Sequence, residues 1–183
     1  MNLPLFSDVL ILQAFWVFLP AGVANMAPPL ANKIPLLNKW KTPLDLGKSY
    51  NGVRIFGDNK TWRGLVFGMV LAAVTLLVEM SLVASPATGY TATFSLLAGA
   101  LLGFGALLGD AVESFFKRRG GVKPGHSWFP FDQTDYIVGG LVVMLLMGGL
   151  TFNIVGLIFV IYFGLHLVVS YLGFLLGFKN KPI

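Results

Sequence analysis

The longest uncharged stretch of the sequence limits the possible folds most strongly. Residues 136–178 are 43 consecutive positions without Asp, Glu, Lys or Arg. At ~1.5 Å per residue, a single helix of this length would measure about 65 Å, roughly twice the ~30 Å hydrocarbon core of a bilayer. We therefore expect the stretch to cross a membrane twice, turning back between Gly148-Gly149 and Asn153.

Further apolar segments precede this stretch, and the composition supports a membrane protein. Only 11% of the residues are charged and 56% are hydrophobic, whereas soluble domains carry roughly 25% charged residues. We predict an all-α integral membrane protein with a single domain over residues 1–183. Pro20 would kink the first helix, and Pro28-Pro29 would end it. The five predicted spans are residues 8–28, 63–84, 91–116, 132–149 and 152–178, with cytoplasmic loops at 29–62 and 117–131.

The basic residues predict the orientation of the chain. All thirteen Lys and Arg lie in three places, with seven in the first loop, four after the third span and two in the C-terminal tail. Five spans place these three regions on one side of the membrane. The positive-inside rule then predicts an outer N-terminus and a cytoplasmic C-terminus. The net charge of +5 is thereby explained without a nucleic-acid partner, and the absence of cysteine excludes disulfides and thiolate metal sites.

The segment 109–135 concentrates charge between apolar spans, with four of the eight carboxylates of the chain. Asp110 and Glu113 stand three residues apart, and Lys117 follows on the same helix face. Asp132 and Asp135 repeat this spacing at the start of the fourth span. Charges inside a membrane segment are costly and usually mark functional sites. Together these carboxylates predict a Mg²⁺ site at one membrane face, because Mg²⁺ prefers hard oxygen ligands and substrate phosphates.

Structural explanations compete with this metal site. Asp110 would simply pair with an arginine from another loop, or Asp132 and Asp135 would cap the fourth helix and complement its dipole. His166 is expected to be packed or hydrogen-bonded within the fifth span, and Glu79 to lie at the outer interface. The glycine pairs are better explained by close helix packing than by catalysis; they are Gly99/Gly103, Gly105/Gly109 and Gly173/Gly177.

Cationic side chains next to the carboxylates favour a polyphosphate ligand. Lys60 and Arg63 stand in the sequence GDNKTWRG at the entry to the second span. A glycine-containing basic loop from Lys117 to His126 follows the third span. Metal ions and Lys or Arg side chains stabilise the charge on a transferring phosphoryl group. No Walker-type GxxxxGK[ST] motif is present, so the site is not a P-loop.

The order of these motifs resembles a known family. The signature of the membrane CTP:phosphatidate cytidylyltransferases, or CDP-diacylglycerol synthases, is closely similar to Gly109-Asp110, Glu113-Ser114, Lys117-Arg118, Lys123, Pro124-Gly125-His126 and the pair Asp132 and Asp135. The first loop, through Leu46-Gly47-Lys48 and Gly57 to Gly64, resembles the shorter archaeal branch of CDP-archaeol synthases. The sequence departs from the bacterial pattern at Gln133, where an arginine is usual, and at Ser127-Trp128, which replace glycines.

The resemblance implies a nucleotidyl transfer in phospholipid biosynthesis. CMP would pass from CTP to the lipid phosphomonoester 2,3-bis-O-geranylgeranyl-glycerol 1-phosphate, giving CDP-archaeol and pyrophosphate. The implied partners are CTP, a prenyl-chain lipid phosphate and the bilayer, with Mg²⁺ as cofactor. The implied metal ligands are Asp110, Glu113, Asp132 and Asp135, which with Lys117 form the catalytic set. The implied nucleotide- and phosphate-binding residues are Lys60, Arg63, Lys117, Arg118, Lys123 and His126.

The alternative from a different functional class is a polytopic cation channel or transporter with interfacial acidic residues. Such a protein is expected to carry carboxylates near the middle of the bilayer on several helices. Here the carboxylates gather at one end of the spans, beside cations. Two other membrane enzyme classes are disfavoured because their motifs are absent: the DGxxAR run of CDP-alcohol phosphotransferases and the NxxxDxxxD motif of membrane prenyltransferases.

Overall fold

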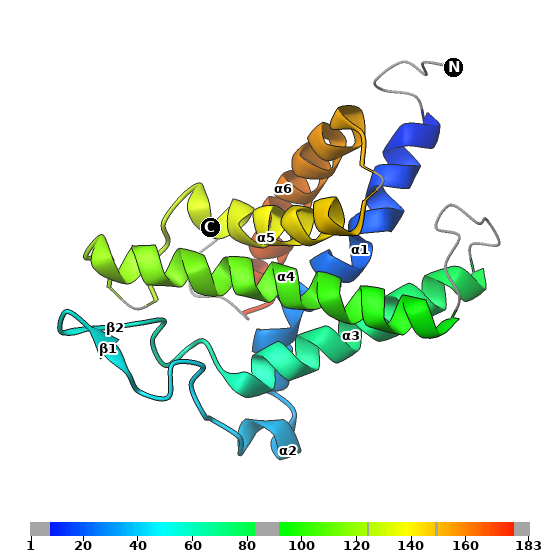
Figure 1. The fold of residues 1–183 in the computed structure, drawn as a ribbon. Helices are drawn as coiled ribbons and strands as arrows, with labels where there is room; N and C mark the ends of the chain where they lie inside the picture. The colour runs from blue at the N-terminus through cyan, green and yellow to red at the C-terminus, as the bar shows by residue number, and fades with distance from the viewer. Residues whose placement is uncertain (1–7, 83–91, 124, 149, 178–183) are drawn as a thin grey trace.

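The protein is mostly helical. The computed structural model describes residues 8–82, 92–123, 125–148 and 150–177, with the side chains of 92–95 excepted. Its helices are α1 (Asp8–Ala31), α2 (Pro35–Asn38), α3 (Trp62–Leu82), α4 (Ala92–Arg119), α5 (Phe131–Met147) and α6 (Phe152–Leu175) (Figure 1). The first loop, residues 32–61, also contains an antiparallel pair of two-residue strands, β1 (Ser49–Tyr50) and β2 (Val53–Arg54). The prediction of a purely helical chain missed this small hairpin.

Among the residues that the structure describes, four helices are long and apolar enough to cross a membrane: α1, α3, α6 and residues 96–119 of α4. The fifth helix, α5, has 17 residues. One face of α3 shows a row of valines at every fourth position, each 42–52% exposed; they are Val66, Val70, Val74 and Val78. An apolar row that faces away from the bundle suits contact with lipid, so these helices describe a multi-pass membrane protein.

The end of α1 differs from the prediction. Pro28-Pro29 does not terminate the helix, which continues to Ala31. Each proline lacks an N–H and so removes one hydrogen bond from the helix, but its fixed φ matches the helical value. The helix can therefore continue through the two prolines to its end. The amide of Asn32 donates to the carbonyl oxygen of Pro28 at 3.3 Å. The proline pair therefore lies inside the last turns of α1.

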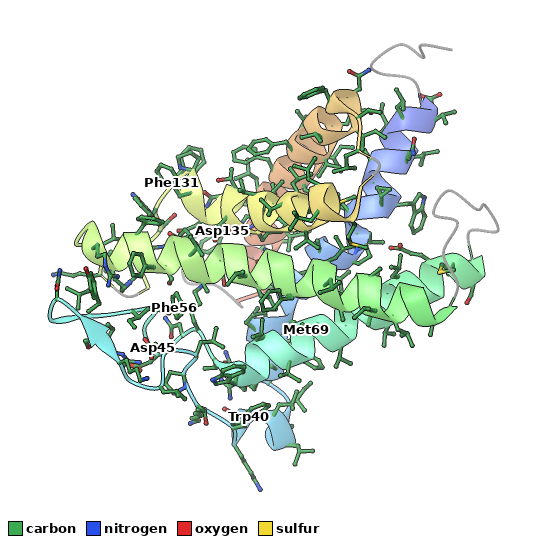
Figure 2. All side chains as sticks on the ribbon, viewed as in Figure 1. Trp40, Asp45, Phe56, Met69, Phe131 and Asp135 are labelled. Atoms are coloured by element: carbon green, nitrogen blue, oxygen red, sulfur yellow. The ribbon has the colours of Figure 1, made fainter. Side chains whose placement is uncertain are left out.

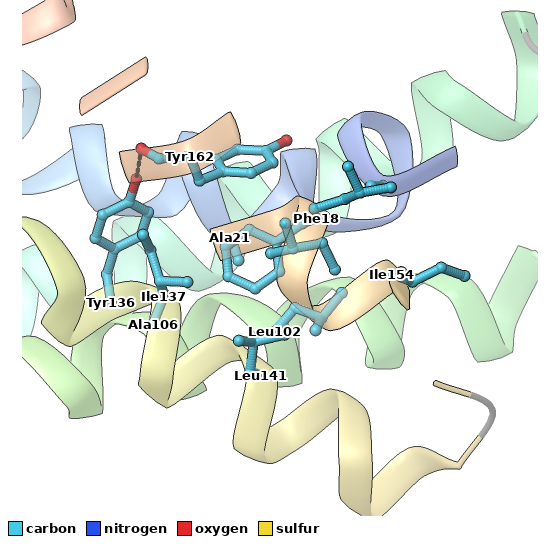
Figure 3. Close-up of a cluster of buried hydrophobic side chains, with 12 residues drawn as sticks. Phe18, Ala21, Leu102, Ala106, Tyr136, Ile137, Leu141, Ile154 and Tyr162 are labelled. Atoms are coloured by element: carbon cyan, nitrogen blue, oxygen red, sulfur yellow. Dashed lines mark hydrogen bonds between the residues drawn. The ribbon is translucent and has the colours of Figure 1, made fainter. Parts of the chain in front are cut away.

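The core lies where α1, α4, α5 and α6 meet, and Figure 3 shows its side chains. Phe18 and Ile137 are fully buried there. The Tyr136 hydroxyl donates to the carbonyl oxygen of Tyr162 at 2.8 Å, and the Tyr162 hydroxyl donates to that of Phe15 at 2.6 Å. Association of helices in lipid depends on packing and on such hydrogen bonds, since lipid chains are themselves apolar. These contacts fix α6 against α1 and α5.

Two polar residues of the spans lie within the bundle. The His166 ring is 5.7 Å from the Tyr136 ring, centroid to centroid, in agreement with the expected packed histidine. Glu79 is only 8% exposed. The side chain is thus covered within the bundle, and the expected place of Glu79 at the outer interface stays a prediction.

Glycines bring α4 and α5 into backbone contact. A Cβ added to Gly109 would lie 2.2 Å from the carbonyl oxygen of Asp135, and one added to Gly139 would lie 2.1 Å from that of Gly105. Neither position has room for a methyl group. Gly99 likewise packs against α3, with 2.7 Å from its added Cβ to the carbonyl oxygen of Ala72. The close-packing interpretation holds at these positions, and the contact at Gly109 places the start of α5 beside the carboxylates of α4.

Candidate active site

Three carboxylates from two helices form a cluster beside this contact. Asp110 and Glu113 project from α4, and Asp135 from the first turns of α5. One carboxylate oxygen from each lies within 4.8 Å of the other two. Figure 2 shows Asp135 in the region where α5 runs along α4. The i, i+3 spacing puts the two α4 side chains on one face, and the glycine contact brings the third to them.

Lys60 approaches the cluster from the first loop. Its ammonium group forms an ion pair with Asp110 Oδ1, and both side chains are about four-fifths buried, with 19% and 21% exposure. The expected pairing of Asp110 with an arginine is therefore wrong, since its partner is a lysine. Burial lowers the pKa of Lys60, but the charge and hydrogen bond of Asp110, together with the charges of Asp135 and Glu113, outweigh burial and leave the pKa above its ordinary value. Lys60 is thus a permanent cation at the edge of the cluster.

Lys117 and Asp132 form a second pair next to the cluster. Lys117 Nζ contacts Asp132 Oδ1 and lies 3.7 Å from Glu113 Oε1. The other oxygen of Asp132 accepts a hydrogen bond from the amide of Trp128 at 2.6 Å. The Asp132 carboxylate therefore holds the loop that precedes α5 as well as a lysine. It lies in the first turn of α5, but the helix has no side-chain cap hydrogen bond, so the capping explanation is wrong for Asp132.

The cluster fits a divalent cation. Glu113 Oε1 is buried and has no hydrogen-bond partner among the described residues. Four carboxylates face only two lysines here, so the charges of the group do not balance. Oxygen ligands that are all carboxylate suit a hard ion such as Mg²⁺. Within the described ranges, Asp110, Glu113 and Asp135 form a group that could hold such an ion.

The remaining cations expected at the site lie in different surroundings. Arg63 donates to the carbonyl oxygen of Asn38 at 3.0 Å and contacts the Asn32 side chain, so it ties α3 to the end of α1 and to α2. Arg118 Nε is buried without a hydrogen-bond partner in the described part of the chain. Lys123 and His126 are exposed in the loop after α4, where the His126 amide donates to the Lys123 carbonyl at 3.2 Å.

Two residues near the site were missed by the sequence analysis. Arg119 stacks its guanidinium carbon 3.4 Å from the Phe115 ring centroid and 5.3 Å from that of Tyr50 in β1. The sequence analysis used Arg119 only as one of the basic residues that predict the orientation of the chain. Asp45 is a buried carboxylate at the centre of the first loop. The Asp-x-Gly sequence at Asp45, typical of a turn closed by an aspartate side chain, was the available signal.

Comparisons with known proteins point to one family. A family model described as CarS-like CDP-archaeol synthase matches residues 7–183. A CDP-archaeol synthase from Halorubrum lacusprofundi is 34% identical over 94% of this chain and 97% of its own length. One from Methanoculleus marisnigri is 38% identical over 90% of this chain and 99% of its own length. These relatives carry the name of a synthase, which does not favour the channel or transporter alternative.

A solved structure has a similar fold. It is described as an intramembrane enzyme for the biosynthesis of archaeal membrane lipids. The TM-score is 0.74 at 28% sequence identity, and the match covers 87% of this chain and 94% of the other. The helical arrangement described above is therefore shared with a membrane enzyme of lipid biosynthesis.

Proposed function

We propose that this chain, which belongs to the CDP-archaeol synthase family, transfers CMP from CTP to 2,3-bis-O-geranylgeranyl-glycerol 1-phosphate. The products are CDP-archaeol and pyrophosphate. Members of this family are membrane cytidylyltransferases of archaeal lipid biosynthesis.

One observation carries the proposal. The carboxylates of Asp110, Glu113 and Asp135 converge at one end of the membrane helices, and Lys60 and Lys117 flank them. A lipid phosphate is anchored at the membrane surface, and a nucleoside triphosphate arrives from water. A site that joins the two must lie at this level and must balance phosphate charge. The cluster lies at the end of the helices, as the first requirement asks, and a bound divalent cation together with Lys60 and Lys117 would meet the second.

The chemistry needs little proton transfer from the protein. An oxygen of the lipid phosphomonoester attacks the α-phosphorus of CTP, and the bond from that phosphorus to the β-phosphate oxygen breaks as pyrophosphate leaves. A phosphomonoester has a second pKa of about 6 and is therefore already anionic near neutral pH. Catalysis then depends on alignment and on the neutralisation of charge.

Each group of residues has a proposed task. Asp110, Glu113 and Asp135 would hold Mg²⁺, which would supply positive charge to phosphate groups. Asp132 completes the acidic set from its place beside Lys117. Lys60 and Lys117 bind phosphate oxygens once substrates enter. Arg118, Lys123 and His126 bind the triphosphate from the loop after α4. Arg63 supports this face through Asn32 and Asn38.

We also propose that α5 is a fifth span and that the site faces the cytoplasm. This arrangement puts all thirteen Lys and Arg on one side of the membrane, as the positive-inside rule requires. It also exposes the site to cytoplasmic CTP. Single cysteines introduced into the cysteine-free chain at Asn51 and Gly121 test the face of the site, and one at Lys181 tests the fifth span. Labelling of any of them by an impermeant reagent in intact cells, without lysis, would contradict the arrangement.

The activity test uses the full-length protein in lipid with Mg²⁺, labelled CTP and the geranylgeranyl-ether glycerol phosphate. We expect labelled CDP-lipid from the wild type. Asp135→Asn should reduce the rate by about 10²–10³-fold, the loss typical of removing one charge-stabilising group. Asp58→Asn is the control, because that carboxylate is 80% exposed on the first loop.

The two parts of the proposal can fail separately. No labelled lipid from the wild type would refute the reaction. Full activity in Asp135→Asn would leave the reaction standing and remove the metal assignment. A diacyl glycerol phosphate used as efficiently as the ether lipid would remove the proposed tail specificity.

A further inference from the structure

The first loop is closed at its base next to Lys60. Pro43 and Thr61 form an antiparallel bridge. The amide of Leu44 donates to the carbonyl oxygen of Lys60 at 2.8 Å, and the amide of Trp62 donates to that of Thr42 at 3.0 Å. The two ends of the loop are therefore joined by backbone hydrogen bonds, and Lys60 stands at the junction.

A single buried carboxylate organises the loop above this junction. The Asp45 side chain is fully buried, with 0% exposure. It accepts hydrogen bonds from the amides of Gly47, Phe56 and Gly57, each at 3.0 Å, and from Arg54 Nε at 3.3 Å and Nη2 at 2.6 Å. A buried charge is tolerable only when it is paired and hydrogen-bonded, and these donors satisfy both oxygens.

The charge on Asp45 is stable. Burial raises the pKa of its carboxyl group, but the hydrogen bonds from Arg54 and from the backbone amides outweigh burial and hold the pKa well below the ordinary range. Figure 2 shows Asp45 and Phe56 together in the loop beside α4. The carboxylate thus joins the start of the loop to the segment that leads into Lys60.

Short steps connect this carboxylate to Lys60 on both sides. Asp45 follows Leu44, whose amide holds the Lys60 carbonyl. Asp45 also holds the amide of Gly57, whose carbonyl accepts from the Lys60 amide at 3.4 Å. The backbone N–H and C=O of Lys60 are therefore both held by residues next to Asp45 in sequence or bonded to its carboxylate. The ammonium group of Lys60 meanwhile reaches Asp110.

We propose that Asp45 is a positioning residue, which holds Lys60 in place against the carboxylate cluster through the folded first loop. The inference rests on the proposed function, because the consequence of correct placement is a faster cytidylyl transfer. Asp45 touches neither the cluster nor the reacting groups. Its effect passes through the backbone around Gly57 and Leu44.

A matched pair of variants isolates this role. Asp45→Asn and Asp58→Asn remove the same charge from the same loop, and both residues bond Arg54. Only Asp45 is buried and holds backbone amides; Asp58 is 80% exposed. We expect Asp45→Asn to lower kcat by about 100-fold, as displacement of a catalytic group by roughly 1 Å does. Asp58→Asn should stay within about threefold of the wild type.

Removal of Lys60 tests the route of the effect. In a Lys60→Met background, Asp45→Asn should change kcat by less than about threefold, because effects on one coupled unit are not additive. The same 100-fold factor in both backgrounds would show that Asp45 acts on the whole fold and would overturn the inference. An active wild type with Asp45→Asn as active as Asp58→Asn would overturn it too.

Trypsin digestion without substrate gives a measure independent of activity. Lys48 and Arg54 lie inside the loop, and cleavage after each is followed by mass spectrometry. Asp45→Asn should be cut at least about tenfold faster than wild type and Asp58→Asn, because local opening becomes easier. Equal rates would overturn the inference. A wild type without transferase activity would instead overturn the proposed function, and the inference with it.

Discussion

The two halves of the site are built in opposite ways. The helix half, on α4 and α5, holds its carboxylates by backbone contact at Gly109 and Gly139. The loop half holds Lys60 through hydrogen bonds that converge on Asp45. Membrane helices satisfy their own backbone groups, so close approach is enough to assemble them. A loop has no such ladder and needs a buried side chain to collect its amides.

The difference predicts how each half fails. The helix half should fail when its metal ion is removed or when the volume at the glycine contact changes, because the bundle has no space to yield. A loop half tolerates changes of volume on its exposed surface but not the loss of the one carboxylate that orders it. Four experiments test this contrast, in order of decreasing expected effect.

Metal removal should have the largest effect, and it acts on the helix half. Chelation by EDTA should lower the rate at least about 10³-fold, because a metal ion at phosphates supplies several kcal/mol of charge stabilisation. Added Mg²⁺ should restore it. Mn²⁺ binding measured by electron paramagnetic resonance gives a second observable, which Asp110→Asn should weaken and Asp58→Asn should not. Full activity in EDTA would contradict the metal site.

Gly109→Ala should break the helix half by volume alone. Its Cβ would meet the Asp135 carbonyl oxygen at 2.2 Å, so α5 must move away from α4. We expect a loss of about 1–3 kcal/mol in stability and about 100-fold in rate. The control is Gly156→Ala on α6, where an added Cβ meets nothing within 4 Å. Thermal unfolding and transfer rate are measured for both, and equal behaviour would refute the packing argument.

The loop half should not respond to pH in the neutral range. Asp45 titrates below its ordinary value of 3.8, so its contribution is complete above that pH and is lost only as the pH falls through the lower folded pKa. Lys60 titrates above 10.5, so its contribution is complete below that pH and is lost only above it. The ratio of wild-type to Asp45→Asn activity should therefore be constant from about pH 6 to about pH 9. A sloping ratio would indicate another titrating group.

The smallest effect is expected from the exposed ion pair of the loop. Asp58 accepts from Arg54 at 2.7 Å, but its side chain is 80% exposed. Such pairs contribute about 0–1 kcal/mol because water and salt screen them. Asp58→Asn should therefore leave the unfolding midpoint almost unchanged, with or without added salt. A loss comparable to that of Asp45→Asn would show that the exposed pair orders the loop.

Much of the helix half was predictable from the sequence. Uncharged runs indicated membrane helices, and the spacing of Asp110 and Glu113 indicated one helix face. Outside this half, the end of α1 was predicted wrongly, because Pro28-Pro29 lies within the last turns of that helix. The hairpin of the first loop was missed as well. Its two-residue strands leave no periodic pattern, but Asn51-Gly52 between Tyr50 and Val53 is a typical two-residue hairpin turn and was the available signal.

The sequence by itself determined that the chain is a membrane protein and that its carboxylates gather with cations at one end of the spans. Tertiary structure alone decided the partners. It joined Asp135 to Asp110 and Glu113, directed Asp132 to Lys117 and Trp128, and bound Lys60 to Asp110. It also buried Asp45 under five donors. The physical reason is distance along the chain: helix period and hydrophobicity act locally, whereas Lys60 and Asp110 are 50 residues apart and meet only after the helices pack.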